Sequence, residues 1–303
     1  MLGINGIVNI YKPTGITCAD LVNVFKKHFR ISKVGYAGTL DMFAEGVLPV
    51  LLNKATKISK FIEANDKEYL AEVQLGLATD TGDLTGQPVH QDPGFVLNRT
   101  DLEKVLKTFI GTIRQLPPEY SAIKINGKRA SDLVRQGIKV KVPYRFIKIY
   151  EINLLTLDEA RKTFTMNVKC SKGTYIRALA RDIGKKLHTG GSLNKLVRRR
   201  NGLFTAEDAM TMEEFRKIDD LNRLKIYSMN EVLKHYPALI IKNTYIDYIR
   251  NGKKLNKFHF LDFGDNLING IYKISDKDEN LLAVVEHKNG KFFYLKVFHN
   301  DED

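Results

Sequence analysis

The sequence predicts an α+β protein, on three observations about the spacing of its apolar residues. Residues 17–30 carry apolar side chains three and four positions apart behind a capping residue, which is typical of an amphipathic helix. Residues 68–75 alternate apolar and polar side chains, which is typical of a half-buried strand. From about residue 233 the chain consists of short β-like pieces separated by turns. We therefore expect a larger domain over 1–232 and a small β-rich domain over 233–303.

The composition indicates a globular protein with a polyanionic partner. Of the 303 residues, 43% are hydrophobic, and 48 Lys and Arg against 35 Asp and Glu give a net charge of +13. This excess of positive charge is typical of proteins that bind nucleic acid, whereas a solvated lysine surface is the alternative interpretation. The distribution of the charges along the chain has to decide between the two.

The cysteines and the N-terminal residues indicate the cellular compartment of the protein and whether it has a metal site. Cys18 and Cys170 have neither the spacing of metal ligands nor that of a disulfide framework, which favours a reducing compartment. The N-terminal residues lack a basic stretch followed by an apolar one, and no apolar run reaches about 18 residues. We expect a cytoplasmic protein with no metal site and no membrane partner.

The first elements lead to a loop that is hard to interpret as core. Residues 6–10 predict a short buried strand, residues 13–15 a turn, and Thr17 the N-cap of the first helix. The next segment, 35–49, contains three glycines but also several large apolar residues, so it is able to present one side chain rigidly. The candidate is Asp41, as a nucleophile or base. The alternative is an aspartate that only closes an Asx-turn.

The middle of the chain predicts a helix, a strand and a second helix, followed by a basic segment. We expect a helix over 55–64, a strand over 68–75 with Tyr69 on its apolar face, and a helix capped by Thr100. Between residues 124 and 148, eight basic residues stand against one acid, a net charge of +7 in 25 residues. With its glycines and prolines, this segment predicts a partly mobile basic lobe suited to phosphates.

A strand-to-helix unit carries the next candidate residue. Residues 164–170 alternate as a strand, Gly173 marks a turn, and Arg177 lies in the first turn of the following helix. The helix dipole disfavours a cation there, so we expect a carboxylate partner for Arg177; an unpaired surface arginine is the alternative. A second basic patch follows, and two such patches favour nucleic acid over a solvated lysine surface. Its members are Lys185, Lys186, Lys195, Arg198, Arg199 and Arg200.

Five pieces of the sequence together resemble one family. In chain order they are Lys12-Pro13-Thr14-Gly15, residues 35–49, Asp66-Lys67-Glu68-Tyr69, Cys170 to Arg177, and Leu196 to Gly202. In this combination they closely resemble the TruB family of tRNA pseudouridine synthases, over essentially the whole chain. The resemblance implies a catalytic domain with a mixed, mostly antiparallel central sheet and flanking helices. It also implies that the tail is a small RNA-binding PUA-like domain.

The resemblance implies isomerisation of the T-loop uridine of tRNA, at position 55, to pseudouridine by base flipping, without cofactor or metal. Asp41 would attack the flipped-out nucleotide, either at C1′ or on the uracil ring, and Arg177 would pair with Asp41 and orient it. Tyr69 would stack on uracil, and its hydroxyl would serve in proton removal from C5. The partner would be the T arm of tRNA, and the enzyme would act as a monomer.

Further residues are implied around the substrate. Leu196 is similar in position to an apolar residue of the pocket wall, and Lys12 belongs to a motif that buttresses the catalytic loop. Tyr36 stands where many relatives have a histidine that fills the space left by the extruded bases; an aromatic ring can still stack there. The basic lobe would fold over the T arm. The full set of expected substrate-binding residues is Tyr36, Leu196, Lys12, Gly38, Lys128, Arg129 and Arg198.

Two alternatives stay open at this point. An N-glycosylase or nucleotide hydrolase would use Asp41 against C1′ with water as the final acceptor, and the mass of its product would differ from that of the substrate. A non-catalytic RNA-binding or RNA-folding protein would use only the basic patches and the tail. The joint presence of Asp41, Tyr69 and Arg177 argues against the second alternative.

Overall fold

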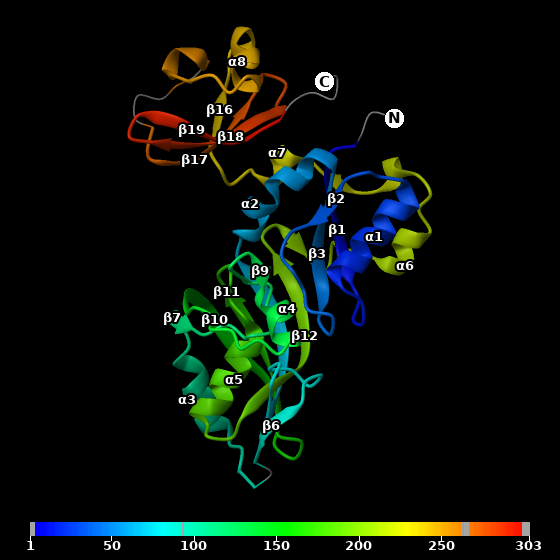
Figure 1. The fold of residues 1–303 in the computed structure, drawn as a ribbon, viewed down its shortest axis with the longest axis vertical. Coiled ribbons are helices and arrows are strands. Elements are labelled where there is room, and N and C mark those ends of the chain that lie inside the picture. The colour runs from blue at the N-terminus through cyan, green and yellow to red at the C-terminus, as the bar shows by residue number, and fades with distance from the viewer. Residues whose placement is uncertain (1–3, 93, 262, 264–266, 299–303) are drawn as a thin grey trace.

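The computed structural model describes residues 4–92, 94–261, 263 and 267–298. Figure 1 shows a large body that carries a small β domain at one end. The body is built on one sheet. Its strands are β1 (Gly6–Lys12), β2 (Val34–Tyr36), β3 (Glu45–Leu52), β4 (Lys67–Leu75), β7 (Gly111–Gln115), β10 (Arg145–Asp158), β11 (Thr163–Cys170), β12 (Gly191–Asn201), β13 (Phe204–Thr205), β14 (Met210–Thr211) and β15 (Ile226–Tyr227).

The sheet is mixed and mostly antiparallel, as predicted. Neighbouring strands follow the order β14, β1, β3, β12, β4, β11, β10, β7, while β2, β13 and β15 pair beside this path. β12 runs antiparallel to β4 but parallel to β3, with Arg198 opposite Gly46. β12 therefore joins a half built on β1 and β3 to a half built on β4, β11, β10 and β7.

Two apolar clusters cover the sheet. Helices α1 (Cys18–Phe29), α3 (Arg99–Lys107), α5 (Ile176–Lys186) and α6 (Met212–Arg216) share the first cluster with the strands of both halves. The second cluster holds Ile7, Val47 and Leu51 of β1 and β3, and it brings in η1 (Asn53–Ile58), α2 (Ser59–Glu63) and α7 (Met229–Val232). Within the described residues, every helix is too short or too polar to cross a bilayer.

The helix starts show where capping chemistry predicts structure and where it misleads. Thr17 caps α1 in a capping box with Asp20, as predicted. The prediction that Thr100 caps the next helix is wrong, because Asn98 accepts the Asp101 N–H from an extended backbone and α3 begins at Arg99. The helix expected over 55–64 is split into the 3₁₀ turn η1 and the short helix α2.

Most strands of the body were not predicted, and β2, β3 and β12 show why. The expected loop 35–49 is in fact two strands around a shorter loop, 37–44, because Tyr36 of β2 pairs with Val50 of β3. β3 is buried along almost its whole length, so it lacks the alternation that marks a half-exposed strand. β12 was interpreted as part of a basic patch. In a strand, however, its basic residues point alternately to opposite faces of the sheet.

The C-terminal part has its own sheet and core. Its strands follow the order β16, β17, β18, β19, and the residues between them include the short helix α8. Their bounds are β16 (Ala238–Ile240), β17 (Gly270–Ser275), β18 (Leu281–Lys288), β19 (Lys291–Val297) and α8 (Ile246–Arg250). A separate apolar cluster fills this sheet, while Leu281, Val284 and Phe298 join the second cluster of the body. The β-rich character is confirmed, and a boundary at 232/233 stays a prediction.

Smaller elements project from the half of the body built on β4. β5 (Leu77–Thr79) and β6 (Pro88–Gln91) form a hairpin. The predicted basic lobe contains the hairpin of β8 (Lys124–Ile125) and β9 (Lys128–Arg129), followed by the helix α4 (Ala130–Arg135). Its own apolar cluster is small, with Ile123, Ala130 and Val142 as buried members.

Candidate active site

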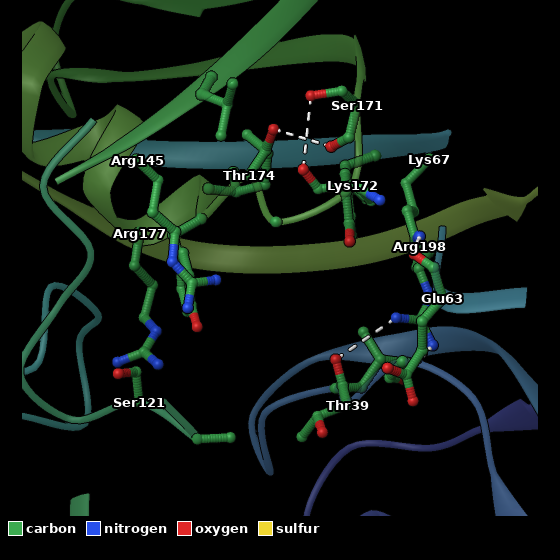
Figure 2. Close-up of a pocket in the computed structure, with 18 of the residues that line it drawn as sticks. Thr39, Glu63, Lys67, Ser121, Arg145, Ser171, Lys172, Thr174, Arg177 and Arg198 are labelled. Atoms are coloured by element: carbon green, nitrogen blue, oxygen red, sulfur yellow. Dashed lines mark hydrogen bonds between the residues drawn. The ribbon is translucent and has the colours of Figure 1, made fainter. Parts of the chain in front are cut away.

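A cleft of about 830 Å³ opens beside loop 37–44, where that loop, β4, β12 and the start of α5 come together. Figure 2 shows its wall: Arg145, Arg177 and Ser121 lie on one side, Lys67 and Glu63 on the other. Both halves of the sheet contribute to this wall, so the cleft lies across the joint that β12 makes.

Loop 37–44 presents Asp41 to this cleft because buried residues on the protein side of the loop fix its backbone. Leu40 and Ala44 are buried on either side of Asp41, whose side chain keeps 38% of its surface exposed. The Cys18 thiol of α1 accepts the Leu40 N–H at 3.2 Å and lies 3.4 Å from the Leu40 carbonyl oxygen. The loop therefore offers an accessible carboxylate on a fixed backbone.

Arg198 is part of that support, and this corrects the expectation that it contacts RNA from an exposed patch. Only 1% of its surface is exposed. Its Nε donates to the Val47 carbonyl oxygen at 2.8 Å, and its Nη2 donates to that of Gly38 at 2.9 Å. Arg198 thus satisfies carbonyl groups at both ends of the loop, because its place in β12 points it under the loop and away from solvent.

Lys12 and Gly38 also belong to the support. Lys12 is fully buried, and its ammonium donates to the carbonyl oxygens of Pro13 and Ala44, each at 2.7 Å. Burial lowers the pKa of Lys12. Gly38 has a φ of +81°, and a Cβ there would lie 3.4 Å from Nη1 of Arg198. The structure gives Lys12 the buttressing place, without the access to substrate that we also expected.

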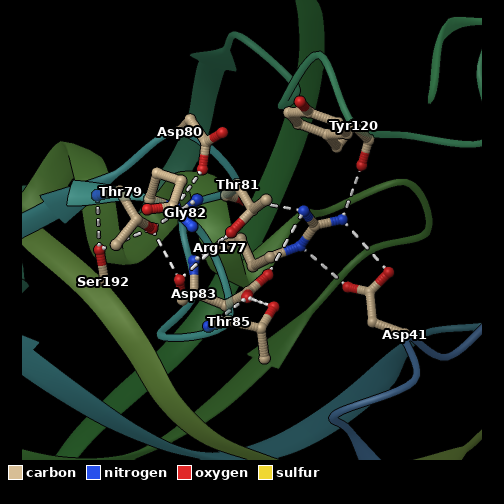
Figure 3. Close-up of polar contacts among 11 residues, drawn as sticks. Asp41, Thr79, Asp80, Thr81, Gly82, Asp83, Thr85, Tyr120, Arg177 and Ser192 are labelled. Atoms are coloured by element: carbon tan, nitrogen blue, oxygen red, sulfur yellow. Dashed lines mark hydrogen bonds and ion pairs between the residues drawn. The ribbon is translucent and has the colours of Figure 1, made fainter. Parts of the chain in front are cut away.

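Arg177 pairs with Asp41 at the wall of the cleft, and Figure 3 shows the contacts of Arg177. Its Nε lies 2.9 Å from Oδ2 of Asp41, and its Nη2 donates to Oδ1 at 3.2 Å. Its Nη1 donates to the Thr81 carbonyl oxygen at 2.8 Å, and its Nη2 also donates to that of Tyr120 at 2.9 Å. Asp41 is therefore the carboxylate partner expected for Arg177. The two-point contact fixes the rotation of the carboxylate.

Asp83 is a residue of the site that sequence reasoning missed. It is 4% exposed, and its Oδ2 lies 3.7 Å from Nη1 of Arg177. A tight turn places it there: Gly82 has a φ of +77°, and a Cβ at Gly82 would lie 3.4 Å from the Cβ of Arg177. Residues 79–86 are rich in Gly, Thr and Asp, which is typical of a turn, but nothing local in the sequence points to Arg177. Asp83 gives the buried guanidinium a second negative charge.

Tyr69 and Leu196 form the floor of the cleft. Both line it, at 9% and 6% exposure. Tyr69 lies on the buried face of β4, as predicted. Burial raises the pKa of Tyr69 to about 12, so its phenol carries its proton at neutral pH and is able to donate a hydrogen bond.

The comparisons with known proteins agree with this geometry. A profile of the TruB family pseudouridylate synthase N-terminal domain matches residues 26–176. A protein named tRNA pseudouridine synthase B from Clostridium perfringens is 41% identical over 251 residues, which cover 83% of this chain and 84% of that protein. A protein of the same name from Clostridium kluyveri is 35% identical over 97% of this chain and 99% of its own length.

This chain belongs to the TruB family of pseudouridylate synthases.

Solved structures extend the similarity of this TruB-family chain to its C-terminal sheet. A chain in the crystal structure of a Cbf5-Nop10-Gar1 complex superposes with a TM-score of 0.74 at 25% identity, covering 97% of this chain and 85% of that one. A chain of an H/ACA RNP bound to a substrate RNA superposes at 0.72 and 24% identity, covering 98% and 86%. The fold class is thereby confirmed for both parts of the chain.

The structure places the remaining predicted residues outside the cleft. Tyr36 ends β2 and is half-buried against the first apolar cluster, so its contact with bases left behind by flipping stays a prediction for the RNA-bound state. Lys128 and Arg129 are exposed on the basic lobe. Gln115 fixes the base of the lobe, because its side-chain amide donates to the Tyr175 carbonyl oxygen at 3.1 Å and accepts the Tyr175 N–H at 2.9 Å.

The second basic patch is not one continuous exposed surface. Lys195 and Arg200 lie on β12 opposite carboxylates of β4, 3.9 Å from Glu72 and 3.8 Å from Glu68. Arg198, between them in sequence, is buried. Strand alternation and these ion pairs disperse the charge that looks continuous in the sequence. Within the described residues, no cluster of His, Cys, Asp and Glu side chains is suited to a metal ion.

Proposed function

We propose that this TruB-family protein isomerises the T-loop uridine of tRNA, at position 55, to pseudouridine, with Asp41 as the nucleophile. The observation that carries the proposal is the exposed Asp41 carboxylate held at two points by the buried Arg177. The relatives named tRNA pseudouridine synthase B support tRNA as the substrate. The proposal includes the T arm as the partner, the cytoplasm as the compartment, and a single chain as the active unit.

The chemistry replaces the N1–C1′ bond of uridine by a C5–C1′ bond and moves a proton from C5 to N1. The N1–C1′ bond breaks, the uracil turns, C5 bonds to C1′, and the proton on C5 leaves while N1 gains a proton. Asp41 attacks the flipped-out nucleotide and makes the detachment of uracil possible; the bond that Asp41 forms breaks again before the product leaves, which restores the carboxylate. The closed floor made by Tyr69 and Leu196 confines the loose base while it turns.

Tyr69 has a defined part in this scheme. Its buried ring lines the cleft, which supports the proposal that it stacks on uracil. With a pKa of about 12, its hydroxyl enters the reaction as a donor. Proton removal from C5 through this oxygen therefore requires that the proton of the phenol passes on in the same step, for instance to N1 or to the Asp41 carboxylate.

The test is a single-turnover reaction of the protein with an unmodified tRNA transcript, followed by carbodiimide mapping of pseudouridine, with Asp41→Asn alongside. We expect a mark at the T-loop uridine with wild type and none with Asp41→Asn, a loss of at least about 10³-fold, with RNA binding retained. Marks elsewhere would keep the chemistry and change the substrate. An RNA product of altered mass would instead support an N-glycosylase, and RNA binding without any product a non-catalytic protein.

A further inference from the structure

The cations that line the cleft fall into two groups. Arg177, Arg198 and Lys67 are buried, and each donates to groups of the protein itself; Lys67 donates to the carbonyl oxygens of Glu63 and Asn65. Arg145 and Lys172 line the same cleft and are exposed. Within the described residues, neither of these two side chains has a hydrogen bond or an ion pair.

Arg145 is held over the cleft by its position in the sheet. It is the first residue of β10, and a Cβ on Gly173 would lie 3.9 Å from its Nη1. Figure 2 shows its guanidinium directed into the cleft, on the same side as Arg177. The neighbouring turn is fixed to β10, because Lys148 N–H donates to Ser171 Oγ and Ser171 N–H donates to the Lys148 carbonyl oxygen, each at 2.8 Å.

Ser121 supplies an independent sign that this side of the cleft is built for a ligand. It is 4% exposed and lines the cleft, and its Oγ has no hydrogen-bond partner within the described residues. The Tyr175 phenol lies close enough to Ser121 to interact with it. A buried hydroxyl without a partner is unfavourable unless a bound molecule completes it.

These groups match one ligand chemistry. A guanidinium fork with free N–H groups, an ammonium and a hydroxyl donor together suit the oxygens of a phosphate. An RNA nucleotide that reaches Asp41 brings its two flanking phosphodiesters to the rim of the cleft. We propose that Arg145, Lys172 and Ser121 form a binding site for a phosphodiester next to the flipped uridine. This inference rests on the proposed function for the identity of the RNA.

The site is tested by a double-mutant cycle in which one change is in the protein and the other replaces a charged phosphate of the RNA by a neutral group. A T-arm hairpin RNA is prepared with a methylphosphonate at either phosphate flanking the target uridine, after a 2′-O-methyl nucleotide for chemical stability. Its dissociation constant is measured with Asp41→Asn protein, which cannot turn over, and with the same chain carrying Arg145→Gln. We expect Arg145→Gln to weaken binding of the normal RNA about 10-fold. The slope of the logarithm of the binding constant against the logarithm of the salt concentration should also become shallower by about one.

The outcome depends on whether the losses of binding free energy from the protein change and from the RNA change add up when both are made. At one of the two positions, the methylphosphonate should weaken binding to the Asp41→Asn protein but have almost no further effect once Arg145 is replaced. Lys148→Gln is the matched control, since Lys148 lies on the same strand, does not line the cleft and is stacked over Tyr150; its effect should add to that of the methylphosphonate. Additive losses with Arg145→Gln at both positions, or unchanged affinity, would overturn the site.

The result is separable from the proposed function. Arg145→Lys keeps a charge without the fork and should recover part of the affinity, which a misfolded variant would not do. Pseudouridine mapping with wild-type protein reports the function alone. If pseudouridine forms but the losses from Arg145→Gln and from the methylphosphonate are additive, the phosphate site is ruled out and the proposed function stands. Coupling between Arg145 and one phosphate, without pseudouridine, would keep the site and remove the function.

Discussion

The loop around Asp41 and the basic lobe use positive charge in opposite ways. Under loop 37–44, Lys12 and Arg198 are buried and bonded to carbonyl oxygens. On the lobe, Lys128 and Arg129 are exposed, and only Arg135 among its basic residues forms an ion pair within the described part, at 3.7 Å from Asp132. The first region uses its cations to hold a carboxylate in place, while the second keeps its cations in solvent, where we propose that they contact RNA.

The difference predicts which property each cation controls. A buried, fully bonded cation affects stability and turnover, because its loss leaves polar groups without partners. An exposed cation affects RNA affinity and its salt dependence. Arg177 links the two regions, because it donates both to Asp41 and to the Tyr120 carbonyl oxygen at the base of the lobe.

Arg198→Met should have the largest effect. The variant leaves the carbonyl oxygens of Gly38 and Val47 without their donor in a buried site, and we expect a loss of about 3 kcal/mol in the free energy of unfolding. Urea unfolding measures it. Arg199→Met is the control, since Arg199 is exposed and paired only with the exposed Glu207; its loss should stay below about 1 kcal/mol. Equal losses from both variants would contradict the support role of Arg198.

Arg177→Met should come next, and should act mainly on turnover. Without the two-point contact the Asp41 carboxylate rotates freely, and we expect kcat to fall about 10²-fold with KM changed much less. Arg177→Lys should recover only part of kcat, because an ammonium cannot make the two-point contact. Single-turnover and steady-state kinetics on a tRNA transcript separate the terms. A rise in KM alone would instead assign Arg177 to RNA binding.

Replacing Lys128 and Arg129 together by Gln should change only affinity. We expect about 10-fold weaker tRNA binding at moderate salt, a shallower salt dependence, and an unchanged free energy of unfolding. Lys26→Gln with Lys27→Gln removes the same charge from α1, and should leave the affinity nearly unchanged. If both pairs weaken binding equally, the lobe acts through net charge and makes no local phosphate contacts.

Lys67 should show the smallest effect, as a dependence of stability on pH. Burial lowers its pKa from 10.5 to about 8 in the folded protein. Between these two values the unfolded chain binds more protons at this residue, so its contribution to stability rises as the pH increases from about 8 to 10.5. Comparing Lys67→Met with wild type at about pH 8 and about pH 9, we expect the difference in unfolding free energy to shift by about 1 kcal/mol in favour of wild type. A pH-independent difference would show that Lys67 titrates normally.

The sequence predicts those parts of the structure that have a local signal. The Thr17 cap, the buried face of β4 with Tyr69, and the need of Arg177 for a carboxylate all follow from the spacing or position of a few residues. β3 has no such signal, because it is buried on both faces. In the same way, the run of basic residues in β12 gives no sign that the Arg198 side chain is buried in the protein.

The contacts of the candidate site depend on distant parts of the chain. Asp83 reaches Arg177 only because the turn at Gly82 packs against α5. Arg198 reaches loop 37–44 only because β12 lies beside β3. Capping and alternation act within a few residues, so they carry no information about these pairings. The resemblance to a family predicts the pairing of Asp41 with Arg177, and only the structure shows the other contacts.

The parallel pairing of β12 with β3 also sets the order in which the protein can mature during translation. Asp41 leaves the ribosome early, but the guanidinium that holds its loop belongs to a residue synthesised much later. Until β12 has emerged, the loop has the support of Lys12 and Cys18 but lacks that of Arg198. The start of β3, which pairs with β12, is then an open edge of the sheet. A chain that ends before β12 would therefore carry Asp41 without a complete cleft around it, and we expect such a chain to bind chaperones.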